Sequence, residues 1–172
     1  TPTTITGVSS YGLSSPVLGD YNNDQIDDVA FAGDLAGNLW RYDLTNSDPT
    51  KWTVALAYQP TTQGVQPITV MPRLFPDPVT NRFIVVFGTG KYLGSLDNTT
   101  SGSTQAVYGI RDTGTQVSGT TNLVQQTLNE VAGTGSNAGN TIIGITSNSV
   151  PASNDGWYFN LVAGGERVVV TP

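Results

Sequence analysis

Residues 19–44 read GDYNNDQIDDVAFAGDLAGNLWRYDL, and this stretch decides how the fold is interpreted. The apolar run at 28–33 ends in glycine and is typical of a short strand entering a turn. Residues 34–37 form a tight polar turn, and residues 37–43 then alternate as a second strand. The stretch therefore predicts two neighbouring strands with a polar loop ahead of the first.

The loop ahead of the first strand carries oxygen ligands at a regular spacing. Side-chain oxygens occur at Asp20, Asn22, Asp24 and Asp28, and the backbone carbonyl of Ile26 falls at the seventh position. Calcium takes roughly six to eight oxygen ligands, which a tight loop supplies from alternate positions. Four of the eleven Asp residues lie within 20–28, where their charges would repel one another without a cation. The spacing predicts one calcium site.

This loop differs from a helix-loop-helix calcium site, which needs Gly at position 6 and Glu at position 12. Those positions hold Gln25 and Phe31 here, and the loop leads into a strand. An Asx-rich turn without a metal remains the alternative, because Asn and Asp bond their own backbone in turns. Asp27 is not expected to be a ligand, because neighbouring strand residues point to opposite faces and Asp28 would face the ion.

The composition excludes several classes of function. The chain has 172 residues, only 12% of them charged, and is rich in turn-forming residues, as expected for an all-β protein with a real core. A net charge of -6 disfavours nucleic-acid binding. The absence of His and Cys removes the commonest general base and any thiolate metal site. No apolar run is long enough for membrane insertion.

Short strand patterns recur along the chain between turn signals. We expect eleven strands, near 15–18, 28–33, 37–43, 53–58, 68–75, 82–88, 106–112, 123–131, 141–146, 156–161 and 166–170. Residues 123–131 also fit one face of a helix, so the strand assignment stays open there. The turn phrase at 32–43 is similar to those of quinoprotein-like propeller blades. Eleven strands would make about three blades, too few to close a usual ring.

Five phrases occur in an order that resembles the C-terminal propeller of the PilY/PilC family, the type IV pilus tip-associated adhesin and biogenesis proteins. These phrases are residues 19–44, FIVVFGTGKYLG at 83–94, QAVYGIRD at 105–112, DGWYFNL at 155–161 and GERVVV at 165–170. The resemblance implies an all-β, modified or partial β-propeller with one calcium-binding loop. It places the calcium ligands on Asp20, Asn22, Asp24, the Ile26 carbonyl and Asp28.

The resemblance also implies where such a protein acts. Residues 1–172 would form a single β-propeller-type region of a larger protein whose N-terminal domain is absent. Export is implied, to the pilus tip, cell surface or outer membrane of a Gram-negative bacterium. The implied partners are minor pilins of the pilus tip complex, with host or abiotic surfaces bound through other regions.

The leading functional hypothesis is a non-enzymatic propeller module whose Ca²⁺ occupancy regulates pilus extension, retraction and adhesion. A quinoprotein-type redox enzyme is one alternative, because it shares the turn phrase at 32–43. An integrin-like FG-GAP adhesion propeller is another, because it uses nearly the same ligand spacing. In that class each blade should carry its own loop, whereas this sequence holds one.

Overall fold

The two strands expected from the opening stretch pair as a hairpin in the computed structural model, which describes residues 5–98 and 102–172. Strand β2 (Val29–Gly33) runs antiparallel to β3 (Leu39–Asp43). The turn between them is held by Asp34, whose buried carboxylate accepts bonds from the Asn38 backbone N–H at 2.9 Å and from Trp40 Nε1 at 2.8 Å. The local polar residues therefore form a buried turn in which the Asp34 carboxylate is hydrogen-bonded, although the Asn38 side-chain oxygen has no partner.

The hairpin belongs to the first of two five-stranded sheets. Its strands lie in the order β1-β2-β3-β4-β8, with neighbours antiparallel except for the parallel pair β4/β8. The three further strands of this sheet are β1 (Val17–Gly19), β4 (Thr53–Gln59) and β8 (Val117–Ser118). Four strands consecutive in sequence thus form an up-and-down sheet, and a two-residue strand covers the outer edge of β4.

The second sheet repeats this plan. Its strands lie in the order β5-β6-β7-β12-β9, and only β12/β9 is parallel. Its members are β5 (Arg73–Asp77), β6 (Arg82–Gly88), β7 (Ala106–Arg111), β12 (Gly156–Asn160) and β9 (Val124–Gln125). Four antiparallel strands with a covered outer edge are what a propeller blade requires.

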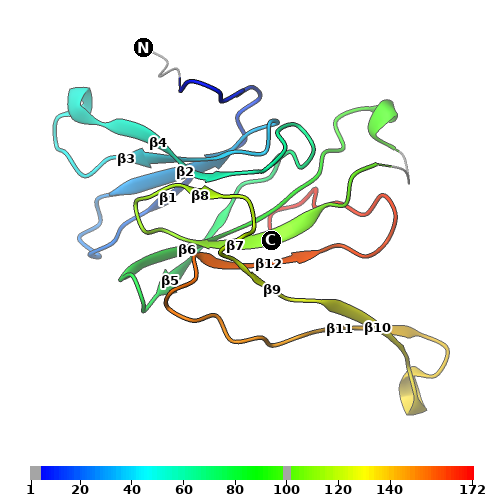
Figure 1. Cartoon of the computed structure of the whole chain (residues 1–172). Coiled ribbons are helices and arrows are strands. Elements are labelled where there is room, and N and C mark those ends of the chain that lie inside the picture. Colours follow the sequence, from blue (N-terminus) through cyan, green and yellow to red (C-terminus); the bar gives the residue numbers. More distant parts are fainter. Residues whose placement is uncertain (1–4, 99–101) are drawn as a thin grey trace.

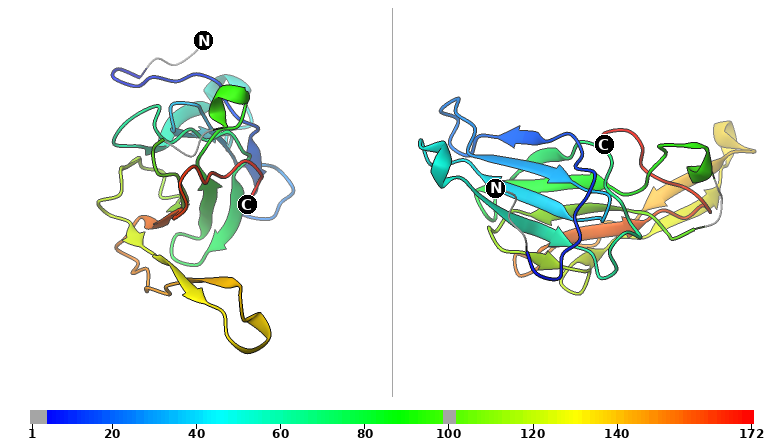
Figure 2. Two further views of the ribbon diagram at one scale, coloured as in Figure 1. Left: turned by 90° about the vertical axis from the view of Figure 1, so that its right-hand side faces the viewer. Right: turned by 90° about the horizontal axis from the view of Figure 1, so that it is seen from above.

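The connection between β7 and β12 supplies the remaining strands. It provides β8 to the first sheet and β9 to the second, and then forms a hairpin of β10 (Leu128–Ala132) and β11 (Thr141–Ile145). This hairpin extends away from both sheets (Figures 1 and 2). The described residues include no α-helix, only short 3-10 turns at Pro49–Lys51, Ser95–Asp97 and Gly135–Asn137. Within those residues, no helix is long and apolar enough to cross a bilayer.

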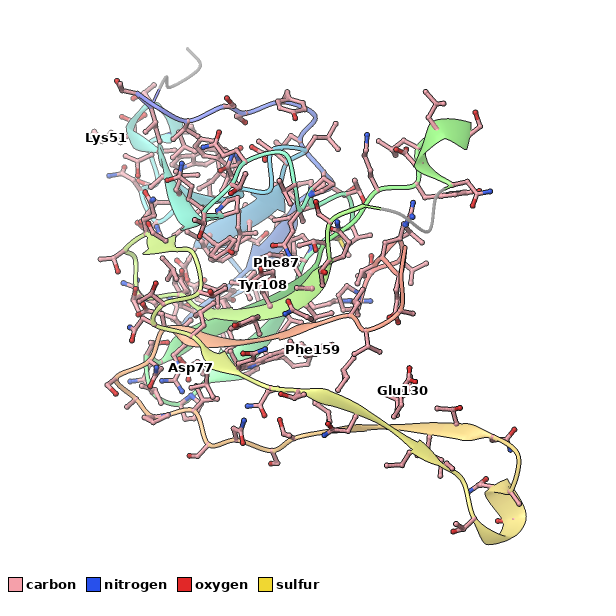
Figure 3. The ribbon with its side chains drawn as sticks, turned by 45° about the vertical axis from the view of Figure 1, so that its right-hand side comes forward. Lys51, Asp77, Phe87, Tyr108, Glu130 and Phe159 are labelled. Atoms are coloured by element: carbon pink, nitrogen blue, oxygen red, sulfur yellow. The ribbon has the colours of Figure 1, made fainter. Side chains whose placement is uncertain are left out.

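The core lies between the two sheets, which stack as layers (Figure 1). Residues that alternate along β2, such as Val29 and Phe31, meet residues such as Val85 and Phe87 that alternate along β6. Within the second sheet Phe87 stacks on its strand partner Tyr108 with ring centroids 5.2 Å apart (Figure 3). Across the sheets, the ring centroid of Tyr58 on β4 lies 5.7 Å from that of Phe87. Both strands contain continuous apolar runs, and every second side chain of each run faces the other sheet because strand residues alternate between faces.

Most strand predictions are confirmed, including the all-β class and the strand interpretation of 123–131, which divides into β9 and β10. Three predictions were wrong. Residues 166–170 form no strand, although the Val168 N–H donates to the Thr89 carbonyl at 2.9 Å. The strand expected over 68–75 occupies 73–77 instead, and Ile68 in the first part of the expected range makes only an isolated β-bridge to Gly90. Three blades were expected, but the described residues form two blade-like sheets and a separate hairpin.

Candidate metal centre

The loop at residues 20–28 joins β1 to β2, and its two ends are held together. The Asp28 N–H donates to the Gly19 carbonyl at 2.8 Å, and Gly19 lies opposite Val29 in the register of the two strands. The base of the loop also lies against the second sheet. A Cβ on Gly19 would stand 2.5 Å from Cε2 of Phe83, so only glycine allows this approach. The loop therefore sits where both sheets meet.

The side chains at alternate loop positions turn back onto the loop's own backbone. Asp20 accepts from the N–H groups of Asn23 at 2.7 Å and Gln25 at 2.8 Å. Asn22 Oδ1 accepts from the Asp24 N–H at 2.8 Å. Asp24 Oδ1 in turn accepts from the Ile26 N–H at 2.9 Å. These are the nested Asx bonds that the sequence allows with or without a metal.

The residues between these side chains adopt backbone conformations that L residues avoid. Asn23 has φ of 61° and Gln25 has φ of 73°. A left-handed conformation costs roughly 1–2 kcal/mol for a residue with a Cβ, somewhat less for Asn. The left-handed residues Asn23 and Gln25 turn the chain directly after Asn22 and Asp24, respectively. These turns keep the side chains of Asn22 and Asp24 on the loop's own backbone.

The last predicted ligand, Asp28, also faces the loop. Its Oδ2 accepts from the Tyr21 N–H at 2.7 Å. Asp28 is half-buried, whereas the neighbouring Asp27 is exposed, as expected from the alternation at a strand end. The Ile26 side chain is a hydrocarbon without an oxygen, so only its backbone carbonyl is suited to a ligand role.

The electrostatics of the loop favour an ionised carboxylate at its first position. Desolvation would raise the pKa of Asp20, but the N–H groups of Gln25, Asn23 and Asn22 outweigh it and lower that pKa. A carboxylate has about four lone-pair sites, so oxygens that accept N–H bonds here retain capacity for a cation.

The donor set fits a hard cation only if uncharged oxygens take part. Within residues 5–98 and 102–172, no three His, Cys, Asp or Glu side chains lie close enough together to hold a metal by themselves. The carboxylates of Asp20, Asp24 and Asp28 therefore do not converge on one point in this conformation. A cation here would require them to draw together, joined by the Asn22 amide oxygen and the Ile26 carbonyl. An all-oxygen set of this mixed kind is the type that Ca²⁺ prefers.

A buried ion pair beside the loop was not recognised from the sequence. Asp112 follows β7, and its side chain is 1% exposed. Its Oδ1 lies 3.1 Å from Nε of Arg41 on β3 and 4.0 Å from an Nη of Arg82. Its other oxygen accepts a hydrogen bond from the Tyr21 hydroxyl. Buried opposite charges at this spacing link the two sheets.

The sequence did contain a signal for this pair. Tyr108, Ile110 and Asp112 share one parity along β7 and its extension, so they point to the same face. Arg41 shares the parity of Leu39 on β3. Both charges therefore extend rows of core residues. That they oppose each other depends on how the sheets stack, which parity does not give.

Comparison with known proteins gives consistent matches. A family model described as the PilY1 beta-propeller domain matches residues 3–140. The type IV pilus biogenesis factor PilY1 of Pseudomonas aeruginosa strain PAO1 is 36% identical over 199 residues, covering 93% of this chain and 17% of that protein. A PilY1 homolog of Xylella fastidiosa is 32% identical, covering 97% of this chain and 14% of its own length.

A solved structure agrees with these matches. The crystal structure of the Pseudomonas aeruginosa PilY1 C-terminal domain superposes with a TM-score of 0.79 at 32% identity, covering 98% of this chain and 43% of that one. The chain thus spans less than half of the solved domain and a much smaller part of the full-length relatives.

Proposed function

The chain belongs to the PilY1 family of type IV pilus biogenesis factors, and from this membership we propose that it is a calcium-binding, non-enzymatic propeller module of a pilus-associated protein. The relatives are named as type IV pilus biogenesis factors, and we propose the same role for the protein to which this chain belongs. In this proposal, calcium occupancy of the module regulates pilus extension, pilus retraction and adhesion.

The observation that carries the calcium part is the loop at 20–28. There the side-chain oxygens of Asp20, Asn22, Asp24 and Asp28 accept N–H bonds from within the loop itself. The Ile26 carbonyl falls at the remaining position of the ligand spacing. When bound, Ca²⁺ supplies positive charge that offsets the repulsion among the carboxylates. Sites with such ligand sets bind calcium with dissociation constants from about micromolar to millimolar.

The partners follow from the family and from the surface chemistry. We propose that the module acts at the pilus tip or cell surface after export, with minor pilins as partners and host or abiotic surfaces contacted by other regions. The net charge of -6 argues against nucleic acid as a partner. Family membership favours this proposal over a redox propeller or an FG-GAP propeller, which shared only local phrases with the sequence.

Calcium is expected to stabilise the chain. A ligand that binds only the folded state adds RT ln(1 + [L]/Kd), about 2.7 kcal/mol at one hundred times Kd. The melting temperature should rise through a calcium titration and fall again with a chelator. Magnesium should do less, because it requires a smaller octahedral shell. Calorimetric titration beside the melting curves tests the site, and a curve that calcium leaves unchanged would contradict it.

Replacing Asp27 with Asn is expected to leave calcium affinity within a few-fold of the parent, because its strand neighbour Asp28 faces the loop and successive side chains point to opposite sides. The variant removes one negative charge near the loop without removing a ligand. Any small loss of calcium affinity therefore reports the screened long-range attraction between that charge and the cation. Isothermal titration gives the comparison with Asp28→Asn. Equal losses in the two variants would refute the proposed geometry.

A further inference from the structure

Tyr21 connects the proposed calcium loop to the junction between the sheets. Its backbone N–H donates to Asp28 Oδ2 at 2.7 Å, so one end of the residue is tied to a proposed calcium ligand. Its ring stacks on Phe83 of β6 with centroids 5.3 Å apart, and the Arg82 guanidinium lies 5.5 Å from the ring centroid. A residue of the first sheet's loop therefore packs on a strand of the second sheet.

The other end of Tyr21 lies in a buried polar cluster. Its hydroxyl donates to Asp112 and accepts from Arg41 Nη2 at 3.2 Å. A tyrosine phenol carries its proton at neutral pH and can therefore act as the donor in this contact. Arg41 also bonds Asp43 at 3.0 Å, which keeps its guanidinium fixed on β3.

Asp112 is the point at which this cluster joins the second sheet. Its N–H donates to the Phe83 carbonyl at 2.8 Å, and its Oδ1 accepts from the Gly114 N–H at 3.2 Å. The side chains of Asp112 and Arg41 are 1% and 10% exposed. Polar contacts in such a poorly solvated setting are stronger than surface contacts. Because hydrogen bonds in a buried network polarise one another, weakening one of them also weakens its neighbours.

We propose that Tyr21 couples calcium occupancy of the loop to the packing of the two sheets, with Asp112 as the receiving group. This inference rests on the calcium site proposed above. An ion that orders Asp20 to Asp28 fixes the Tyr21 backbone between them. A fixed backbone holds the phenol on Asp112, and the Asp112–Arg41 pair then holds the sheets together. Tyr21 acts here as a positioning residue and does not itself bind the ion.

The coupling must be reciprocal, because both sites belong to one equilibrium. If calcium tightens the Asp112 junction, then loosening the contact at Asp112 must weaken calcium binding by the same factor. Typical coupling between sites begins at about fivefold in affinity. Two independent readouts therefore exist, one at the junction and one at the loop.

The experiment compares the parent chain with Tyr21→Phe, which keeps the ring on Phe83 and removes only the hydroxyl. Amide hydrogen exchange at residues 112–114 is measured with and without calcium, and calcium affinity by calorimetry. Tyr42→Phe is the matched control, because Tyr42 is a half-buried tyrosine on β3 beside Arg41. Circular dichroism confirms that each variant folds.

In the parent and in Tyr42→Phe, calcium should slow exchange at residues 112–114 about fivefold or more. In Tyr21→Phe that response should disappear, and calcium affinity should fall about fivefold. Calcium binding by the parent with no change at 112–114 would overturn the coupling while leaving the site intact. The same calcium response in Tyr21→Phe as in the parent would also overturn it. No calcium binding by the parent would overturn both this inference and the proposed function.

Discussion

Replacing Asp112 with Ala is expected to lower the free energy of unfolding by about 3–5 kcal/mol, because removing one partner of a buried ion pair leaves the other uncompensated. Burial alone would lower the pKa of Arg41, but the Asp112 carboxylate outweighs burial and raises it. In the variant that carboxylate is gone, and the guanidinium, which is not deprotonated in proteins, is left buried without its main counter-charge. The Tyr21 hydroxyl would also lose its acceptor. Urea denaturation followed by tryptophan fluorescence measures the loss.

Asp43→Ala is the matched control for Asp112→Ala. Asp43 also contacts Arg41, at 3.0 Å, but its side chain is 33% exposed, so solvent screens the pair. Pairs of this kind contribute up to about 1 kcal/mol. A loss in Asp112→Ala no larger than in Asp43→Ala would mean that the buried pair does not join the sheets.

Asp24→Ala is expected to abolish calcium binding and with it the thermal stabilisation by calcium. Asp24 is the central side chain of the loop, since it accepts from the Ile26 N–H and contacts Asn22 Nδ2 at 3.1 Å. The variant thus removes a charged ligand and loosens its neighbours. At one hundred times the parent Kd, about 2.7 kcal/mol of linkage stabilisation should be absent. Calorimetry and melting curves with and without calcium give the result.

The same substitution in the intact protein tests regulation. With Asp24→Ala, pilus number and twitching motility should change. Asp27→Asn is the control, because it also removes one charge near the loop but no proposed ligand, and it should behave as the parent does. Tight calcium binding by Asp24→Ala would refute the ligand assignment. Lost calcium binding together with normal pili and motility would leave the ion a structural role alone.

The Asp112 cluster and the loop lie on one physical path. Asp28 holds the Tyr21 backbone, and the Tyr21 hydroxyl reaches Asp112. Destabilisation by Asp112→Ala should therefore be larger in the presence of calcium than in its absence if the two sites are coupled. Additive effects would indicate that the ion pair stabilises the sheets independently of the loop.

The sequence by itself determined the local elements. Short continuous apolar runs at 29–33 and 83–87, bounded by Gly and Asx turns, specify β2 and β6, because run length and turn chemistry involve only near neighbours. The ligand spacing of the loop is local for the same reason. The side chains of Asp20, Asn22 and Asp24 bond amides within five residues along the chain, so their inward orientation needs no distant partner.

Only the tertiary structure decided which segments meet across long separations. The two-residue strands β8 and β9 carry too little pattern to be recognised, and they exist because the outer edges of β4 and β12 offer them partners. Residues 166–170 have strand-like composition but remain outside both sheets. Arg41 and Asp112 are 71 residues apart, and their pairing arises because both extend inward-facing rows of residues on sheets that stack face to face. Parity along a strand fixes the face on which a charge lies, but the partner of that charge is fixed by sheet packing.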